Sequence, residues 1–193
     1  ELQSLRTLDG IIRIPESLQN AASFEDMINT HCNIQKDFDN AGITFFNWKT
    51  GERSVYKNKS YVEMKELRGN NPNLQYQYLC LRRVAKIKDF LNYFPTYKKL
   101  FFKFYNQYKS FMKNVHQSYY QYYIKKSISH VSNKFMPHIY RIHHNVYLPS
   151  LNDETPKVIT IGEVYTYFDN IDIGELLYAL NYDNRKATPI KSD

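Results

Sequence analysis

The run of residues 90–123 constrains the fold of this 193-residue chain more than any other stretch. Apolar and aromatic side chains recur in it every three or four residues, which is the period of one face of a helix. They are Phe90, Phe94, Tyr97, Phe101, Phe104, Tyr108, Phe111, Val115, Tyr119 and Tyr122. Polar side chains recur on another face, at Lys99, Lys103, Asn106, Lys113 and Gln117. The pattern predicts a long helix with an aromatic face in the core and a positively charged face in water.

A third set of residues in this run lies off the inward stripe. It consists of Tyr105, Lys109, His116, Tyr120 and Tyr123. Core packing is the ordinary explanation for aromatic side chains on a helix. Rings and hydrogen-bond donors mixed in this way also suit stacked bases and phosphate groups.

The composition favours a polyanion such as nucleic acid as a partner, because 26 Lys and Arg outnumber 19 Asp and Glu. A chain of 193 residues can bury one core, or one core with a small appendage. Cys32 and Cys80 have no CxxC spacing, which predicts reduced thiols and a cytoplasmic or nuclear location. No apolar run approaches the length of a membrane span, so we expect no membrane partner. The chain begins at Glu1 without a methionine, which favours a piece of a longer protein.

The N-terminal third has a mixed pattern of strands and helices. Residues 10–14 indicate a short buried strand, and Ser23 followed by Asp26 is typical of a helix start. Residues 42–48 and 53–57 are expected to pair as a hairpin across the turn residues between them.

After residue 60 the patterns indicate helices only. Helices are expected to start at the capping residues Ser60, Thr160 and Asp172 and near Pro72, Pro95 and Pro137. The helix after Pro72 is expected to continue to about Leu91, and Gly69 is expected to end the helix before it. The predicted fold class is therefore α+β, with a small β-hairpin-containing part at 1–59 and a predominantly helical domain at 60–193.

Residues 42–108 carry a set of short motifs that point to one family. They include Gly42-Ile43-Thr44, Thr50-Gly51-Glu52-Arg53, Lys57-Asn58, Leu67-Arg68-Gly69-Asn70, Leu74-Gln75-Tyr76, Tyr78-Leu79, Leu81-Arg82 and Tyr93-Phe94-Pro95. This pattern resembles the end of the catalytic domain and the helical C-terminal extension of RNA-ligase-like covalent nucleotidyltransferases of large DNA viruses and phages. Residues 67–94 are the most specific part of the resemblance.

The resemblance implies a relationship to enzymes that use ATP to form a lysyl-adenylate and then seal RNA ends with the help of a divalent metal such as Mg²⁺. The nucleophilic lysine of such enzymes lies in a Lys-x-Asp-Gly motif. In this chain Thr7-Leu8-Asp9-Gly10 has no lysine and lies too close to the hairpin to be that motif. The resemblance therefore implies no catalytic residue and no cofactor in this chain, and ATP and Mg²⁺ would belong only to an intact parent ligase.

The hairpin also departs from the family pattern. A metal-binding Glu is implied before a Gly, but Ala41 precedes Gly42, and Asp39 and Asn40 are the nearest polar residues. Of the implied Lys-x-Lys pair that contacts nucleotide phosphates, only Lys57 is present. The chain is thus expected to be a fragment of a ligase or a relative that has lost its catalytic groups.

Basic residues cluster farther along the chain than the hairpin, at Arg82, Arg83, Lys86 and Lys88. Such a cluster is typical of a solvated surface, and it is also typical of a track for an RNA backbone. His130, His138, His143 and His144 lack the spacing of a metal site, which leaves ordinary structural histidines or contacts with phosphates and bases.

We therefore expect an RNA-binding helical region, catalytically incomplete in this chain, located in the cytoplasm, a viral particle or a virus factory. The residues expected to contact RNA are Arg82, Arg83, Lys86, Lys99, Lys103, Lys109 and His116. The first alternative is a structural or scaffold protein, viral or not, whose aromatic helices bind a protein partner. The second is that a longer parent, with its missing N-terminal half, is a working RNA ligase.

Overall fold

The computed structural model describes residues 23–32, 40–152 and 154–186, so the expected strand at 10–14 lies outside the described residues. It shows a mostly helical chain with one two-stranded antiparallel hairpin near the N-terminus, which confirms the α+β class. Contacts divide the chain into two compact units, Glu1–Glu66 and Leu67–Asp193. The division lies within a helix that begins at the expected boundary, and each unit is described by itself below.

The first unit contains α2 (Phe24–His31), β1 (Gly42–Phe46) and β2 (Arg53–Lys57). As predicted, Ser23 begins α2, and its Oγ accepts a hydrogen bond from the Asp26 N–H at 3.1 Å. The strands pair with Gly42 opposite Lys57 and Phe46 opposite Arg53, which confirms the hairpin. The rings of Phe24 and Phe45 lie 4.7 Å apart and pack α2 on β1.

Helix α3 (Lys59–Arg68) follows the hairpin directly. The predicted cap, Ser60, lies inside its first turn, because Asn58 caps the helix instead. The Asn58 Oδ1 accepts from the Ser60 N–H at 3.0 Å, and the Asn58 side chain is 1% exposed. Gly69, in the left-handed conformation with φ of 58°, ends the helix as expected.

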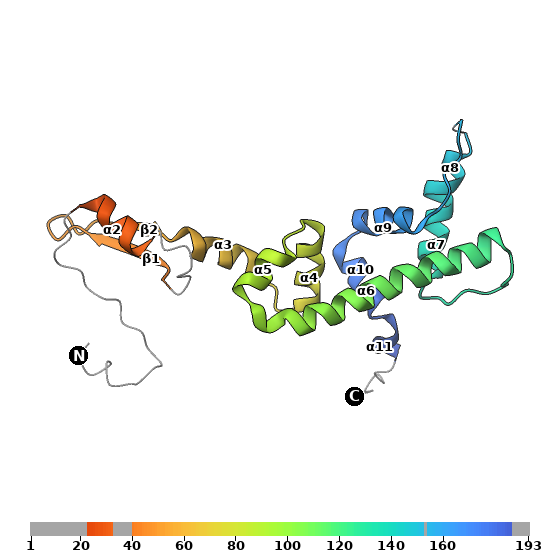
Figure 1. The fold of residues 1–193 in the computed structure, drawn as a ribbon, viewed down its shortest axis with the longest axis horizontal. Coiled ribbons are helices and arrows are strands. Elements are labelled where there is room, and N and C mark those ends of the chain that lie inside the picture. The colour runs from red at the N-terminus through yellow and green to blue at the C-terminus, as the bar shows by residue number, and fades with distance from the viewer. Residues whose placement is uncertain (1–22, 33–39, 153, 187–193) are drawn as a thin grey trace. The chain divides into compact units, whose positions relative to one another are not determined.

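The second unit is built along one long helix, α6 (Lys98–Tyr119). Before it come α4 (Leu74–Arg83), α5 (Ile87–Tyr93) and a 3₁₀ turn at Pro95–Tyr97. After it come a π-helical turn at Tyr120–Ile124, α7 (Met136–Ile142), a second π-helical turn at His143–Tyr147 and α8 (Leu148–Ser150). The described part of the chain ends with α9 (Ile161–Asn170), α10 (Ile173–Leu180) and α11 (Tyr182–Lys186). Helices α4, α7, α9 and α10 all pack on α6 (Figure 1).

The single helix expected between Pro72 and Leu91 is wrong, since the structure has α4 and α5 there. Ala85 lies in the left-handed conformation with φ of 56° and reverses the chain. The Lys86 N–H donates to the Leu81 carbonyl at 2.9 Å and the Ala85 N–H to the Arg82 carbonyl at 3.2 Å. This is the Schellman arrangement that normally uses glycine, so an alanine gives no turn signal in the sequence.

The predicted inward stripe runs from α5 through α6 into the π-helical turn and forms the core of the second unit. Six of its members are buried and the other four are partly buried against them. Phe90 and Phe101 stack with ring centroids 4.9 Å apart and planes within 5°. Met112, absent from the predicted stripe, is also fully buried. The caps of the last two long helices are confirmed, since Thr160 and Asp172 accept from the N–H groups of Glu163 and Glu175.

Candidate nucleic-acid interface

The solvent face of α6 carries five lysines, and the helix contains no Asp or Glu. The lysines are Lys98, Lys99, Lys103, Lys109 and Lys113, and all five are exposed. No ion pair between described residues involves any of them. Surface helices commonly place opposite charges three or four residues apart, where they attract one another. The lysines of α6 lack this compensation within the described part of the chain, so α6 presents an unopposed positive face.

The positive charge extends beyond α6 along the sequence. Residues 90–152 contain nine Lys or Arg and no Asp or Glu, whereas all 19 acidic residues lie elsewhere in the chain. The net charge of the whole chain does not reveal this segment, whereas the distribution of acidic residues along the sequence does. The acid-free segment covers all of α6 and α7.

Aromatic side chains lie exposed among these lysines. Phe102, Tyr105 and Tyr120 are 63%, 45% and 44% exposed. They share one edge of the helix with three lysines, because the spacings of three, four and seven residues return to the same side. We call this edge the aromatic stripe, and it consists of Lys98, Phe102, Tyr105, Lys109, Lys113 and Tyr120. The Lys109 Nζ lies 5.8 Å from the centre of the Tyr105 ring, and the Lys125 Nζ lies 5.4 Å from that of Tyr120.

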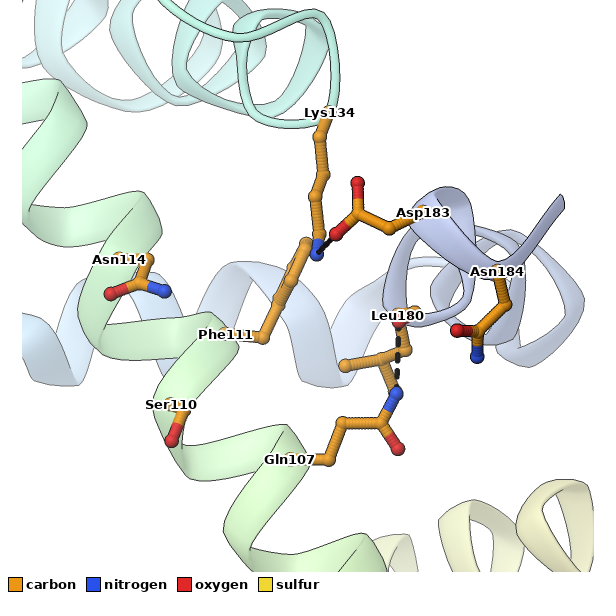
Figure 2. A pocket seen from close by; sticks show the side chains of 8 residues that line it. All are labelled: Gln107, Ser110, Phe111, Asn114, Lys134, Leu180, Asp183 and Asn184. Atoms are coloured by element: carbon orange, nitrogen blue, oxygen red, sulfur yellow. Dashed lines mark hydrogen bonds and ion pairs between the residues drawn. The ribbon is translucent and has the colours of Figure 1, made fainter. Parts of the chain in front are cut away.

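A polar pocket of about 210 Å³ lies beside another part of α6, between that helix and the α10–α11 region (Figure 2). The Gln107 Nε2 donates to the Leu180 carbonyl at 2.9 Å, and this contact forms one wall. The Lys134 Nζ and the Asp183 Oδ2 are 2.7 Å apart. Because these two charges neutralise each other, the pocket does not extend the positive face.

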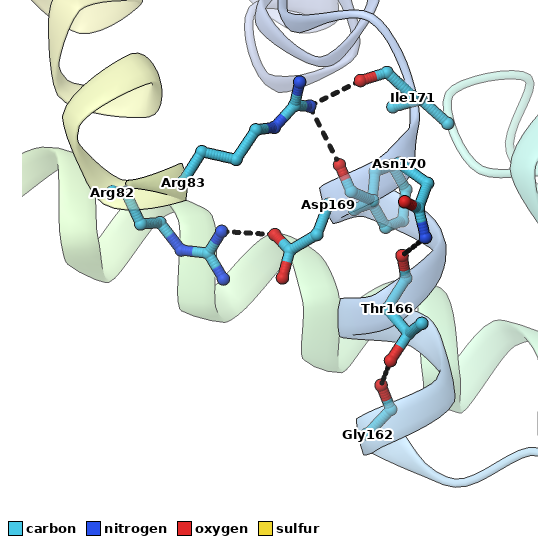
Figure 3. A network of polar contacts seen from close by, with 8 residues as sticks. Arg82, Arg83, Gly162, Thr166, Asp169, Asn170 and Ile171 are labelled. Carbon is cyan, nitrogen blue, oxygen red and sulfur yellow. Dashed lines mark hydrogen bonds and ion pairs between the residues drawn. The ribbon is translucent and has the colours of Figure 1, made fainter. Parts of the chain in front are cut away.

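Arg82 and Arg83, both expected to contact RNA, hold α4 against α9 (Figure 3). The Arg82 Nη1 lies 2.5 Å from the Asp169 Oδ1, and the Arg82 Cζ lies 4.0 Å from the centre of the Tyr108 ring. Arg83 donates to the carbonyls of Phe168 and Ile171, at the C-terminal end of α9. The partners are 85 to 88 residues away in the sequence, so no local pattern reveals these contacts. Both guanidinium groups thus have structural partners, and RNA contact by them stays a prediction.

Tyr108, which lies under Arg82, is 2% exposed, and its hydroxyl has no hydrogen-bond partner among the described residues. Burial raises the pKa of this tyrosine strongly, against the opposing effect of Arg82. A buried hydroxyl without a partner has lost its hydrogen bonds to water. We therefore expect Tyr108→Phe to raise the free energy of unfolding by about 1 kcal/mol, measured by urea unfolding. A loss of stability would show that the hydroxyl has a hydrogen bond after all.

The remaining expected contacts fall in four places. Lys99, Lys103 and Lys109 lie together on the exposed side of α6, and Lys86 is exposed at the start of α5. The His116 Nε2 lies 3.1 Å from the Ile159 carbonyl, so this ring fixes the segment before α9. Lys57 is exposed at the end of β2, in the first unit.

The hairpin offers no carboxylate at the place where the resemblance implies a metal ligand. Ala41 is there, and its carbonyl accepts from the Asn58 N–H at 3.1 Å. Asn40 has structural bonds, because its Nδ2 donates to the His31 carbonyl and its Oδ1 accepts from the Gly42 N–H. Asp39 lies outside the described residues. Among the described residues no group of three or more His, Cys, Asp or Glu side chains could hold a metal ion.

The histidines of α7 and the turn after it are packed against aromatic rings. The His143 ring stacks on Tyr123, with centroids 3.8 Å apart, and on Tyr147, with centroids 5.1 Å apart. His138 is 5% exposed, and its Nδ1 lies 3.3 Å from the Tyr167 hydroxyl. These two residues therefore belong to the packing of the unit.

His138 is expected to make the unit sensitive to acid. Burial lowers its pKa to about 4 from 6.5, Glu175 opposes this shift and Arg141 adds to it. The unfolded chain binds the proton near pH 6.5 and the folded chain only near pH 4, so stability is fully present above 6.5 and falls between these values. The loss amounts to up to about 3 kcal/mol. Urea unfolding across this range should show a smaller fall for His138→Gln, and parallel curves would contradict the assignment.

No protein-family model, curated protein or solved structure matches this chain. Among the described residues no helix is both long and apolar enough to cross a membrane.

Proposed function

We propose that this chain binds RNA through the lysine face of α6, formed by Lys98, Lys99, Lys103, Lys109 and Lys113. The observation that carries the proposal is the absence of any acidic residue on a helix with five exposed lysines. Like charges three or four residues apart destabilise a helix, and a bound polyanion removes that repulsion. Exposed ammonium groups can exchange counterions for phosphates without a change in the fold.

The choice of RNA rather than DNA as the ligand rests on the resemblance of residues 42–108 to RNA ligases. In this proposal the chain is the RNA-binding helical region of a ligase-like protein, in the cytoplasm, a viral particle or a virus factory. ATP and Mg²⁺ belong only to an intact parent, with Lys57 as a contact to the nucleotide phosphates. The parent's sequence upstream of Glu1 should then contain a Lys-x-Asp-Gly motif, and an upstream sequence without one contradicts the ligase relationship.

Photo-crosslinking tests where RNA binds. The chain is mixed with a 4-thiouridine-containing RNA, irradiated and digested, and the crosslinked peptides are identified by mass spectrometry. We expect the crosslinks to concentrate in residues 98–123. Crosslinks confined to other segments, or none at all, contradict the proposal. The absence of crosslinks would favour the alternative, in which the aromatic helices bind a protein partner.

A further inference from the structure

Three exposed rings lie along the lysine face of α6 and the π-helical turn after it. Phe102, at 63% exposure, is among the most exposed large apolar side chains of the second unit. The rings of Phe102 and Tyr105 lie 6.4 Å apart with planes 28° from parallel. Tyr120 lies farther along the same edge, about 27 Å from Phe102 at the helical rise of 1.5 Å per residue. Scattered exposed apolar residues are common on proteins, but these three share one edge of the helix with lysines.

Each exposed tyrosine also has an ammonium group beside its ring. Lys109 lies beside Tyr105, and Lys125 lies beside Tyr120. A ring that stacks on a base and a cation within reach of the adjoining phosphate are the two elements of single-strand binding. This pair occurs at Tyr105 on α6 and again at Tyr120 in the π-helical turn after it.

We infer that the aromatic stripe selects single-stranded RNA, with unpaired bases stacked on Phe102, Tyr105 and Tyr120 and phosphates bound by Lys98, Lys109 and Lys113. This inference rests on the proposed function and names the class of RNA that the same face binds. The bases of an A-form duplex are stacked on one another and offer no free ring face along the helix. A duplex would therefore use the lysines and leave the three rings without a partner.

The test compares the affinity of the whole chain for two RNAs of equal length. One is a fluorescein-labelled single strand of about 15 nucleotides without self-complementarity, and the other is the corresponding blunt duplex. Affinities are measured by fluorescence anisotropy for the wild-type chain and for the double variant Phe102→Ala/Tyr105→Ala. A second double variant, Phe102→Leu/Tyr105→Leu, keeps apolar side chains and removes only the rings. The matched control, Tyr140→Ala/Tyr178→Ala, removes two rings that are 51% and 53% exposed elsewhere in the unit.

We expect the wild-type chain to prefer the single strand by at least about tenfold, since each stacked ring contributes a factor of about 5 to 150. Both double variants should lose most of this preference and bind the duplex as the wild-type chain does. The control should bind both RNAs like the wild type. Equal affinity of the wild-type chain for both RNAs, or unchanged single-strand affinity of the double variants, overturns the inference but leaves the proposed function standing. Failure of the wild-type chain to bind either RNA overturns both.

Discussion

Replacing Phe168 with Ala is expected to lower the free energy of unfolding of the helical unit by about 3–5 kcal/mol. Phe168 is fully buried at the place where α6, α7 and α9 meet. Its ring centroid lies 5.5 Å from that of Phe111 and 4.9 Å from that of His138. Removing the ring leaves a cavity between three helices that cannot close without moving them. Urea unfolding followed by circular dichroism at the helix band measures the change.

Phe102→Ala is the matched control, because it removes the same ring from a side chain that is 63% exposed. We expect this variant to change the free energy of unfolding by no more than about 0.5 kcal/mol. Equal losses for the two variants would mean that the core does not lie where the structure puts it.

The second large effect concerns RNA affinity. Replacing Lys99, Lys103, Lys109 and Lys113 with Gln is expected to weaken RNA binding about a hundredfold or more near 0.1 M salt. Each lysine that neutralises a phosphate releases counterions, and this contribution disappears as the salt concentration approaches 1 M. The four side chains are exposed and have no ion-pair partner among the described residues, so the fold should not change. Circular dichroism checks the fold and fluorescence anisotropy measures the affinity.

A control variant separates a local effect from the loss of net charge. Replacing Lys49, Arg53, Lys59 and Lys65 with Gln removes the same four charges from exposed positions in the first unit. We expect this variant to bind RNA within about threefold of the wild-type chain, because the proposed contacts are all on α6 and a charge that neutralises no phosphate releases no counterions. If the two variants lose affinity equally, α6 is not the binding site.

The core of the second unit could be predicted from the sequence because its period is local. The inward stripe from Phe90 to Tyr122 keeps a spacing of three or four residues throughout, even across the break at Pro95. Ser23, Thr160 and Asp172 could be identified for the same reason, since each cap and the N–H that it accepts from are three residues apart. The break at Ala85 could not be predicted, because alanine is a strong helix former and its left-handed conformation here follows from the packing of α4 and α5.

The candidate site was predictable only in part. The lysines of α6 are exposed because they lie opposite the aromatic face, which the period fixes. In the sequence, Arg82 and Arg83 cannot be told apart from the exposed basic residues of α6. In the structure, however, they bind partners on α9 and the turn after it. His116 likewise bonds a carbonyl 43 residues away. Contacts between segments so distant in sequence depend on tertiary packing, which a single sequence does not reveal.

The measurement that tests RNA binding by α6 most directly is the salt dependence of affinity for a single-stranded RNA. Anisotropy titrations of the wild-type chain and of the four-lysine α6 variant cover about 50 to 200 mM salt. A single strand contributes a slope of about −0.7 per neutralised phosphate in a plot of log affinity against log salt. We predict a steep slope for the wild-type chain and a slope shallower by about 2 to 3 for the variant. Equal slopes, or wild-type binding that does not change with salt, would contradict the account.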